Sequence, residues 1–181
     1  MKVRMLFEPG YEEVEALTVV DILRRAKVEC LMVACDDEET VTGSHDICVK
    51  MDEKISEITG DVDMIVLPGG LVGVNNLKAD AAVEKLVKEQ YQKGGYVAAI
   101  CAAPTALGAF GVLEGKVATC YPGMEDQLHC LQAVTDPVVV DGKIITSRGL
   151  GTAIPFALKL VEILVDRETS EELAKKIVYE C

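Results

Sequence analysis

The sequence has no tryptophan and few aromatic residues of any kind. Aromatic side chains make up 4% of the 181 residues, whereas 50% of the residues are hydrophobic, mostly alanine, valine, isoleucine and leucine. Such a composition suits buried parallel strands better than an aromatic-rich β-sandwich. Because 181 residues fit one domain, we expect a single α/β domain over residues 1–181.

Positive charge is also scarce. The chain carries 18 Lys and Arg against 30 Asp and Glu, for a net charge of −12, and no cluster of basic residues offsets it. A surface of this charge repels phosphate backbones and anionic lipid headgroups. We therefore expect neither nucleic acid nor a membrane as a partner.

The pattern that would indicate a disulfide framework or a zinc site is missing. Seven cysteines are an odd number, and no CxxC pair or regular spacing occurs among them. The two histidines, His45 and His129, are far apart in the sequence, and neither is next to Cys101. We expect reduced thiols, no metal and no cofactor, although a Cys–His pair stays open.

No apolar segment of signal-peptide length precedes the first acidic residues, so the expected compartment is the cytosol. Residues 94–113 carry no charge over a length near that of a membrane span. They include four glycines and a proline and are rich in alanine, which favours a buried strand followed by a buried helix.

Short apolar runs alternate with longer helical patterns along the chain. This alternation predicts a mostly parallel, doubly wound sheet. The expected strands are Val3–Phe7, Val28–Ala34, Met64–Leu67 and Tyr96–Ile100, and the expected helices Glu12–Ala26, Ala79–Gln92, Ala153–Val165 and Ser170–Val178. In addition, 41–51 is interpreted as an extended excursion, 138–146 as a hairpin turning at Asp141-Gly142, and Ser170 as a helix N-cap.

Cys101 follows the apolar run Tyr96–Ile100, and Pro104 stands where a helix can begin. The cysteine is therefore expected on a strand-to-helix turn at the carboxyl edge of the sheet, where the helix N-terminus stabilises a thiolate. The alternative is a buried structural cysteine. We assign that role to Cys30, Cys35, Cys48, Cys120 and Cys130, and expect Cys181 to be exposed.

Glu15 lies within the expected helix Glu12–Ala26, on the same arc as Val19 and Ile22 rather than on the polar side. Burial there raises the pKa of a carboxyl group, which suits it to share a proton with a thiolate or to act as a general acid and base. The alternative is a solvated glutamate in the first turn.

Two glycine-containing turns follow strands at the same edge. In Pro68-Gly69-Gly70 the bare backbone amides of Gly69 and Gly70 are candidate oxyanion donors, and Gly149 and Leu150 in TSRGLGT are candidate pocket walls. Each is also compatible with a plain turn. The second lacks the spacing of a P-loop or a dinucleotide-binding motif.

Together, AAICAAPTAL, IVLPGG, YEEVEALTVVDILRRA and TSRGLGTA resemble the ThiJ/PfpI superfamily over nearly the whole chain, and ICAAP and ATCYPG resemble its ThiJ-like branch. The resemblance implies a flavodoxin-like three-layer sandwich, a homodimer, a nucleophilic Cys101 beside a protonated Glu15, and oxyanion amides near Gly70 and Ala102. By analogy, Arg25 and His45 line the rim of the pocket, and His129 takes the place of a family histidine in a later loop.

The resemblance also implies a function. Members are described as glyoxalases or deglycases acting on methylglyoxal and early glycation adducts, as sensors whose cysteine becomes a sulfinate, and as chaperones. Peptidase-like members have a histidine directly after the cysteine, where this chain has Ala102, so peptidase activity is not expected. Two hypotheses follow: a Cys101-dependent enzyme acting on reactive dicarbonyls or glycated substrates, or a redox-sensing chaperone.

Overall fold

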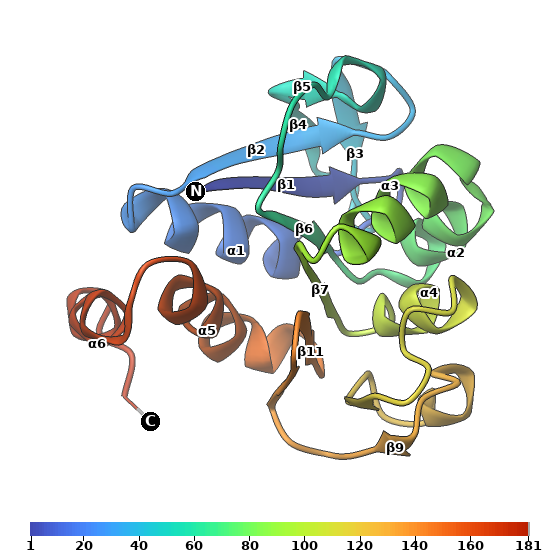
Figure 1. The fold of residues 1–181 in the computed structure, drawn as a ribbon. Helices are drawn as coiled ribbons and strands as arrows, with labels where there is room; N and C mark the ends of the chain where they lie inside the picture. The colour runs from blue at the N-terminus through green and yellow to red at the C-terminus, as the bar shows by residue number, and fades with distance from the viewer. Residues whose placement is uncertain (181) are drawn as a thin grey trace.

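A seven-stranded sheet runs through the middle of the computed structural model, which describes residues 1–180 (Figure 1). The strand order is β10-β11-β7-β6-β1-β2-β5, and every neighbouring pair is parallel except β10 and β11. The strands are β1 (Lys2–Phe7), β2 (Glu29–Ala34), β5 (Glu53–Lys54), β6 (Met64–Leu67), β7 (Tyr96–Ile100), β10 (Val138–Asp141) and β11 (Ile144–Ser147). The predicted α/β class and mostly parallel sheet are confirmed.

Helices cover both faces of this sheet, because successive strand residues point to opposite faces. On one face, Val3, Met5 and Phe7 of β1 share a core with α1 and α5, while Leu6 joins the core under the helices of the other face. The helices are α1 (Glu13–Arg25), α2 (Leu71–Ala79), α3 (Ala81–Gln92), α4 (Pro104–Ala109), α5 (Ala153–Leu164) and α6 (Arg167–Lys176). The expected three-layer sandwich is confirmed.

Smaller elements complete the chain. The excursion over 41–51 contains an antiparallel pair, β3 (Thr40–Thr42) with β4 (Cys48–Lys50), and β8 (Val117–Ala118) pairs with β9 (Gln132–Ala133). Single 3-10 turns occur at η1 (Ile55–Glu57), η2 (Glu125–Gln127) and η3 (Leu150–Thr152). The hairpin β10–β11 turns at Asp141-Gly142 as predicted.

Two helix boundaries differ from the prediction. Asp80 ends α2 and caps α3, since its Oδ1 accepts a hydrogen bond from the amide of Ala82 at 2.7 Å. The last helix is capped by Asp166, which accepts from the amide of Thr169 at 2.7 Å. Ser170 is therefore not the N-cap; its hydroxyl donates to the carbonyl of Leu158 instead and fixes α6 to α5.

The cysteines are less uniform than expected. Cys30, Cys35 and Cys120 are buried, as predicted for structural cysteines, but Cys130 is half-buried and Cys48 is exposed. The prediction is wrong for Cys48 because it lies on β4, which pairs only with β3 outside the main sheet. Cys181 lies outside the described residues.

Residues 94–113 form β7, the following turn and α4, as interpreted from the sequence. Within residues 1–180 no helix has both the length and the apolar character needed to cross a bilayer.

Glu8, directly after β1, is a buried carboxyl group with 7% of its surface exposed. Burial, followed by the charges of Asp80 and Asp36, raises its pKa from 4.5 to about 7. The folded chain therefore binds this proton more tightly than the unfolded chain does. The resulting stabilisation is fully present below pH 4.5 and is lost as the pH rises through about 7.

We expect Glu8→Gln to raise the free energy of unfolding at pH 8 by about 2 kcal/mol, because the amide cannot ionise in its buried site. At pH 4.5 the variant and the wild type should be closely similar. Urea unfolding at the two pH values measures this difference, with Glu38→Gln as an exposed control. A Glu8→Gln effect that is the same at both pH values would contradict the assignment.

Candidate active site

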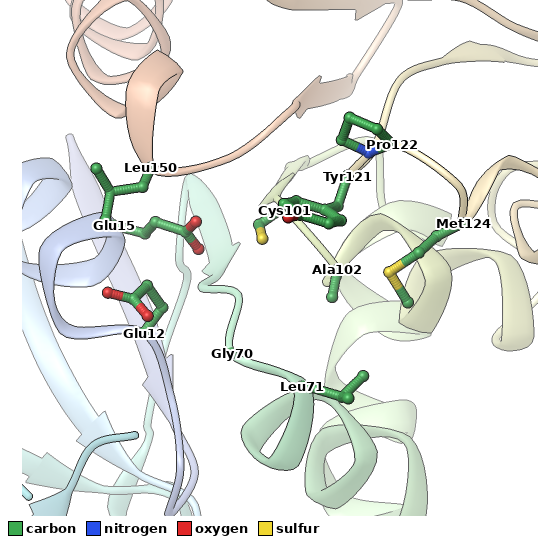
Figure 2. A pocket seen from close by; sticks show the side chains of 10 residues that line it. All are labelled: Glu12, Glu15, Gly70, Leu71, Cys101, Ala102, Tyr121, Pro122, Met124 and Leu150. Atoms are coloured by element: carbon green, nitrogen blue, oxygen red, sulfur yellow. The ribbon is translucent and has the colours of Figure 1, made fainter. Parts of the chain in front are cut away.

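Cys101 stands at the turn between β7 and α4, in a backbone conformation that only glycine adopts without strain. Its φ is 66°, in the left-handed region. Two hydrogen bonds hold it there: its amide donates to the carbonyl of Ser147 at 3.0 Å, and its carbonyl accepts from the amide of Tyr121 at 2.8 Å. The turn directs the thiol out of the carboxyl edge of the sheet, as Figure 2 shows.

Glu15 reaches the same place from the first turn of α1. It is 1% exposed, so the predicted burial is confirmed and the solvated alternative is excluded. Its Oε2 accepts from the amide of Gly69 at 3.0 Å, and its carboxyl group also accepts from the amide of Leu150 and is hydrogen-bonded to the Cys101 thiol. Figure 2 shows the carboxyl group pointing from α1 toward Cys101.

The two groups titrate as a pair. Burial raises the pKa of Glu15 to about 7. Burial, and then the negative charge of Glu15, raise the pKa of Cys101 to about 12, while hydrogen bonds from the amides of Ala102 and Gly70 lower it. Above about pH 7 the pair therefore keeps one proton. The higher pKa is that of Cys101, so the retained proton lies mainly on the sulfur, opposite to the protonated Glu15 and stabilised thiolate expected from the sequence. Transfer of this proton to Glu15 makes Cys101 a thiolate facing two backbone amides.

Glycine at position 69 is a steric requirement of this pair. A Cβ there would lie 2.6 Å from the Cβ of Cys101 and would collide with the carboxyl group of Glu15. Gly70, with φ of 92°, turns the chain into α2 and presents its amide to the sulfur. The predicted donors at Gly70 and Ala102 thus both lie against Cys101.

A pocket of about 510 Å³ opens over Cys101 (Figure 2). Its lining residues are Glu12, Glu15, Gly70, Leu71, Cys101, Ala102, Tyr121, Pro122, Met124 and Leu150. Gly149 stands just behind this lining, since a Cβ there would lie 3.8 Å from Oε1 of Glu15 and 3.9 Å from Sγ of Cys101. The structure therefore brings Cys101, Glu15, Gly69, Gly70, Ala102, Gly149 and Leu150 together.

Three predicted pocket residues are not among those that line it. Arg25 is ten residues beyond Glu15, about 15 Å along α1, and pairs with Asp21 at 2.6 Å. His129 is exposed beyond η2; the loop after β8 contributes Tyr121 to the pocket instead. His45 lies near the rim without lining the pocket, because Glu13 holds it.

Among residues 1–180, one group of side chains has the spacing of metal ligands: Glu12, Glu13 and His45. Nδ1 of His45 lies 2.9 Å from Oε2 of Glu13, and Ser44 also donates to Glu13. Burial opposes the charge of Glu13, but the hydrogen bonds from His45 and Ser44 lower its pKa to about 2. The buried carboxylate is thus neutralised by protein groups, and we assign no metal to it.

Sequence reasoning missed five residues of the lining: Glu12, Leu71, Tyr121, Pro122 and Met124. A signal existed for Glu12, since residues three apart in a helical register share a face and Glu12 precedes Glu15 by three. The loop residues had no such signal. Their place depends on the chain returning from β8 to the end of β7.

The comparisons with known proteins agree with this fold. The model of the DJ-1/PfpI family matches residues 1–163. The chain belongs to the DJ-1/PfpI family. It is 42% identical to Protein DJ-1alpha of Drosophila melanogaster over 179 residues, which cover 97% of this chain and 82% of that protein.

Two further members are informative. The Caenorhabditis elegans protein named glutathione-independent glyoxalase DJR-1.2 is 33% identical over 169 residues, covering 92% of this chain and 89% of that one. The solved structure of oxidised Toxoplasma gondii DJ-1 has a TM-score of 0.96 and 36% identity, with 99% of each chain covered. The DJ-1/PfpI family therefore contains a named glyoxalase and a member solved in an oxidised form.

Proposed function

We propose that this protein is a cofactor-independent glyoxalase that converts α-oxoaldehydes such as methylglyoxal into hydroxy acids. The observation that carries the proposal is the hydrogen bond between the buried carboxyl group of Glu15 and the Cys101 thiol on the floor of an open pocket. A nucleophile beside a group that exchanges protons near neutral pH is what this isomerisation needs. The glyoxalase name of the nematode relative supports the same chemistry.

The proposed reaction begins when the Cys101 thiolate attacks the aldehyde carbon of the substrate. A C–S bond forms, and the carbonyl oxygen takes the electron pair and then the proton of Glu15. The amides of Gly70 and Ala102 stabilise the oxyanion; such donors are each worth about 3 kcal/mol.

Glu15, now ionised, removes the remaining hydrogen of the former aldehyde carbon as a proton and gives it to the ketone oxygen, which forms an enediol. Glu15 then takes the hydroxyl proton of the first carbon, whose C=O bond forms, and delivers it to the second carbon. The first carbon is oxidised and the second is reduced, so no external redox partner is required. The product is a thioester of the hydroxy acid. Water, deprotonated by Glu15, cleaves the C–S bond and releases lactate from methylglyoxal with the free thiol.

The direct test is methylglyoxal consumption by purified protein at neutral pH without glutathione, with lactate measured as the product. Appearance of one lactate for each methylglyoxal consumed supports the proposal. Loss of methylglyoxal without lactate indicates simple thiol trapping, and no loss at all contradicts the proposal. Early glycation adducts, as substrates for deglycation, are tested in the same assay.

A second function rests on the same thiol. Cys101 is partly exposed, faces two backbone amides, and a close structural relative has been solved in an oxidised form. We propose as the alternative that Cys101 acts as a redox sensor of a stress-response chaperone. Hydrogen peroxide transfers one oxygen to the thiolate and leaves as water, and a second peroxide takes the sulfenate to the sulfinate.

Under this alternative, mild peroxide treatment is expected to add two oxygens to Cys101 before any other cysteine reacts. Mass spectrometry of peptides measures the order of oxidation. Cys48 is the internal control, because it is exposed and lies outside the pocket. Oxidation of Cys48 ahead of Cys101 would contradict a sensor role. The homodimer and the cytosolic location implied at the sequence level stay predictions.

A further inference from the structure

The wall of the active-site pocket has an unusual balance of charge. The described residues that line the pocket include two acidic side chains, Glu12 and Glu15, and no lysine, arginine or histidine. Apolar side chains supply most of the remainder, and Leu71, Tyr121 and Leu150 are 64%, 52% and 53% exposed. A ligand in this pocket therefore meets apolar surface and negative charge.

The nearest basic group does not cancel the charge of Glu12. His45 has its Nδ1 2.9 Å from Glu13 and 3.7 Å from Glu12, so it is shared with a second carboxylate that is itself buried. The field of Glu12 also reaches the reacting centre, since its charge contributes to raising the pKa of Glu15. An anionic substrate entering beside Glu12 is repelled.

The pocket is also larger than a three-carbon dicarbonyl requires. Pockets of roughly 300–1,000 Å³ hold drug-sized ligands, and this one has about 510 Å³. Figure 2 shows Leu71 and Met124 on one side of the space above Cys101 and Tyr121 with Pro122 on another. These side chains provide apolar contact area beyond the reacting carbons.

Resting on the proposed glyoxalase function, we infer that the preferred substrates are uncharged α-oxoaldehydes with a bulky apolar substituent, and that Glu12 excludes anionic ones. Glu12 thereby determines specificity without taking part in the bond changes. The same charge acts on the product. Because a neutral dicarbonyl becomes a hydroxy acid that is ionised at neutral pH, Glu12 favours departure of the product over its rebinding.

The test uses three substrates: methylglyoxal, phenylglyoxal, and phenylglyoxal with a para-carboxylate. The readout is a ratio of kcat/KM values within each variant, so that changes in the reactivity of Cys101 cancel. In Glu12→Gln, the preference for phenylglyoxal over its carboxylate is expected to fall about tenfold. Inhibition by mandelate, the anionic product, should strengthen in the same variant.

Asp46→Asn is the matched control for charge. Asp46 is exposed beside His45, lines no part of the pocket, and has φ of 60°, which asparagine tolerates. In Asp46→Asn, the ratio of kcat/KM for phenylglyoxal to that for its carboxylate should equal the wild-type ratio. An unchanged ratio in Glu12→Gln, or a wild type that favours the carboxylate, would overturn the role of Glu12.

Leu71→Ala tests the apolar wall. In this variant, the ratio of kcat/KM for phenylglyoxal to that for methylglyoxal should fall about fivefold, because contact area for the ring is lost. Val72→Ala is the control, since Val72 is an exposed neighbour outside the pocket, and this variant should keep the wild-type ratio. If the wild type turns over methylglyoxal but its kcat/KM is no higher with phenylglyoxal, the inferred substrate preference is wrong and the glyoxalase proposal stands. Inertness toward all three substrates overturns the glyoxalase proposal instead.

Discussion

Replacing Cys101 by alanine is expected to lower kcat/KM for methylglyoxal by at least about 10³-fold. Without the thiol no C–S bond forms, and the isomerisation has no covalent intermediate. Alanine leaves the strained backbone as it is, because neither residue has the freedom of glycine at a φ of 66°. Lactate formation by the wild type and the variant, assayed at equal concentration, measures the effect.

Cys48→Ala is the control for this experiment, since it removes an exposed thiol of β4 that lies outside the pocket. It should turn over methylglyoxal like the wild type. Thermal unfolding of Cys101→Ala should show a folded protein. Lactate formation that survives in folded Cys101→Ala would mean that the chemistry does not pass through this sulfur.

Glu15→Gln is expected to lower kcat by about 10²- to 10⁴-fold. Glutamine can still accept hydrogen bonds from the amides of Gly69 and Leu150, but it cannot carry a proton between the two substrate carbons. The wild-type rate should rise as the pH passes through about 7, where the Cys101–Glu15 pair loses its first proton. That rise should be absent or displaced in the variant.

A second readout separates loss of proton transfer from damage to the fold. The charge of Glu15 raises the pKa of Cys101, so its removal should make alkylation of Cys101 by iodoacetamide faster at neutral pH. Turnover therefore falls while alkylation accelerates. If both slow together, Glu15 serves only to hold the site in shape; if turnover is retained, another group moves the proton.

The juxtaposition of Cys101 and Glu15 could be predicted from the sequence because its signals are local. A strand end followed by a helix start places Cys101 at the carboxyl edge of the sheet, and helical spacing places Glu15 on the buried arc of α1. Strands β1 and β7 both pair in parallel with β6, so the start of α1 after β1 and the turn after β7 lie at the same edge of the sheet. No long-range information was needed beyond the parallel topology.

The rest of the pocket depends on long-range placement. Tyr121 and Met124 arrive from a loop held by a backbone hydrogen bond to Cys101, and sequence spacing does not reveal where such a loop returns. Arg25 and His129 were placed by analogy, and the direction of α1 and the course of the loop move them away. Helix α2 was missed because it contains Gly73, Asn75 and Asn76, which are poor helix formers, and it is held by burial of Val74 and Leu77.

The hydrogen bond from the amide of Tyr121 to the carbonyl of Cys101 ties one wall of the pocket to the proposed nucleophile. A shift of the backbone at Tyr121 therefore also shifts the backbone of Cys101. Changes in the 121–124 loop that alter the fit of a ligand are therefore expected to alter the reactivity of Cys101 as well. Redesign is better aimed at Leu71 and Leu150, which enter the pocket from segments other than the 121–124 loop.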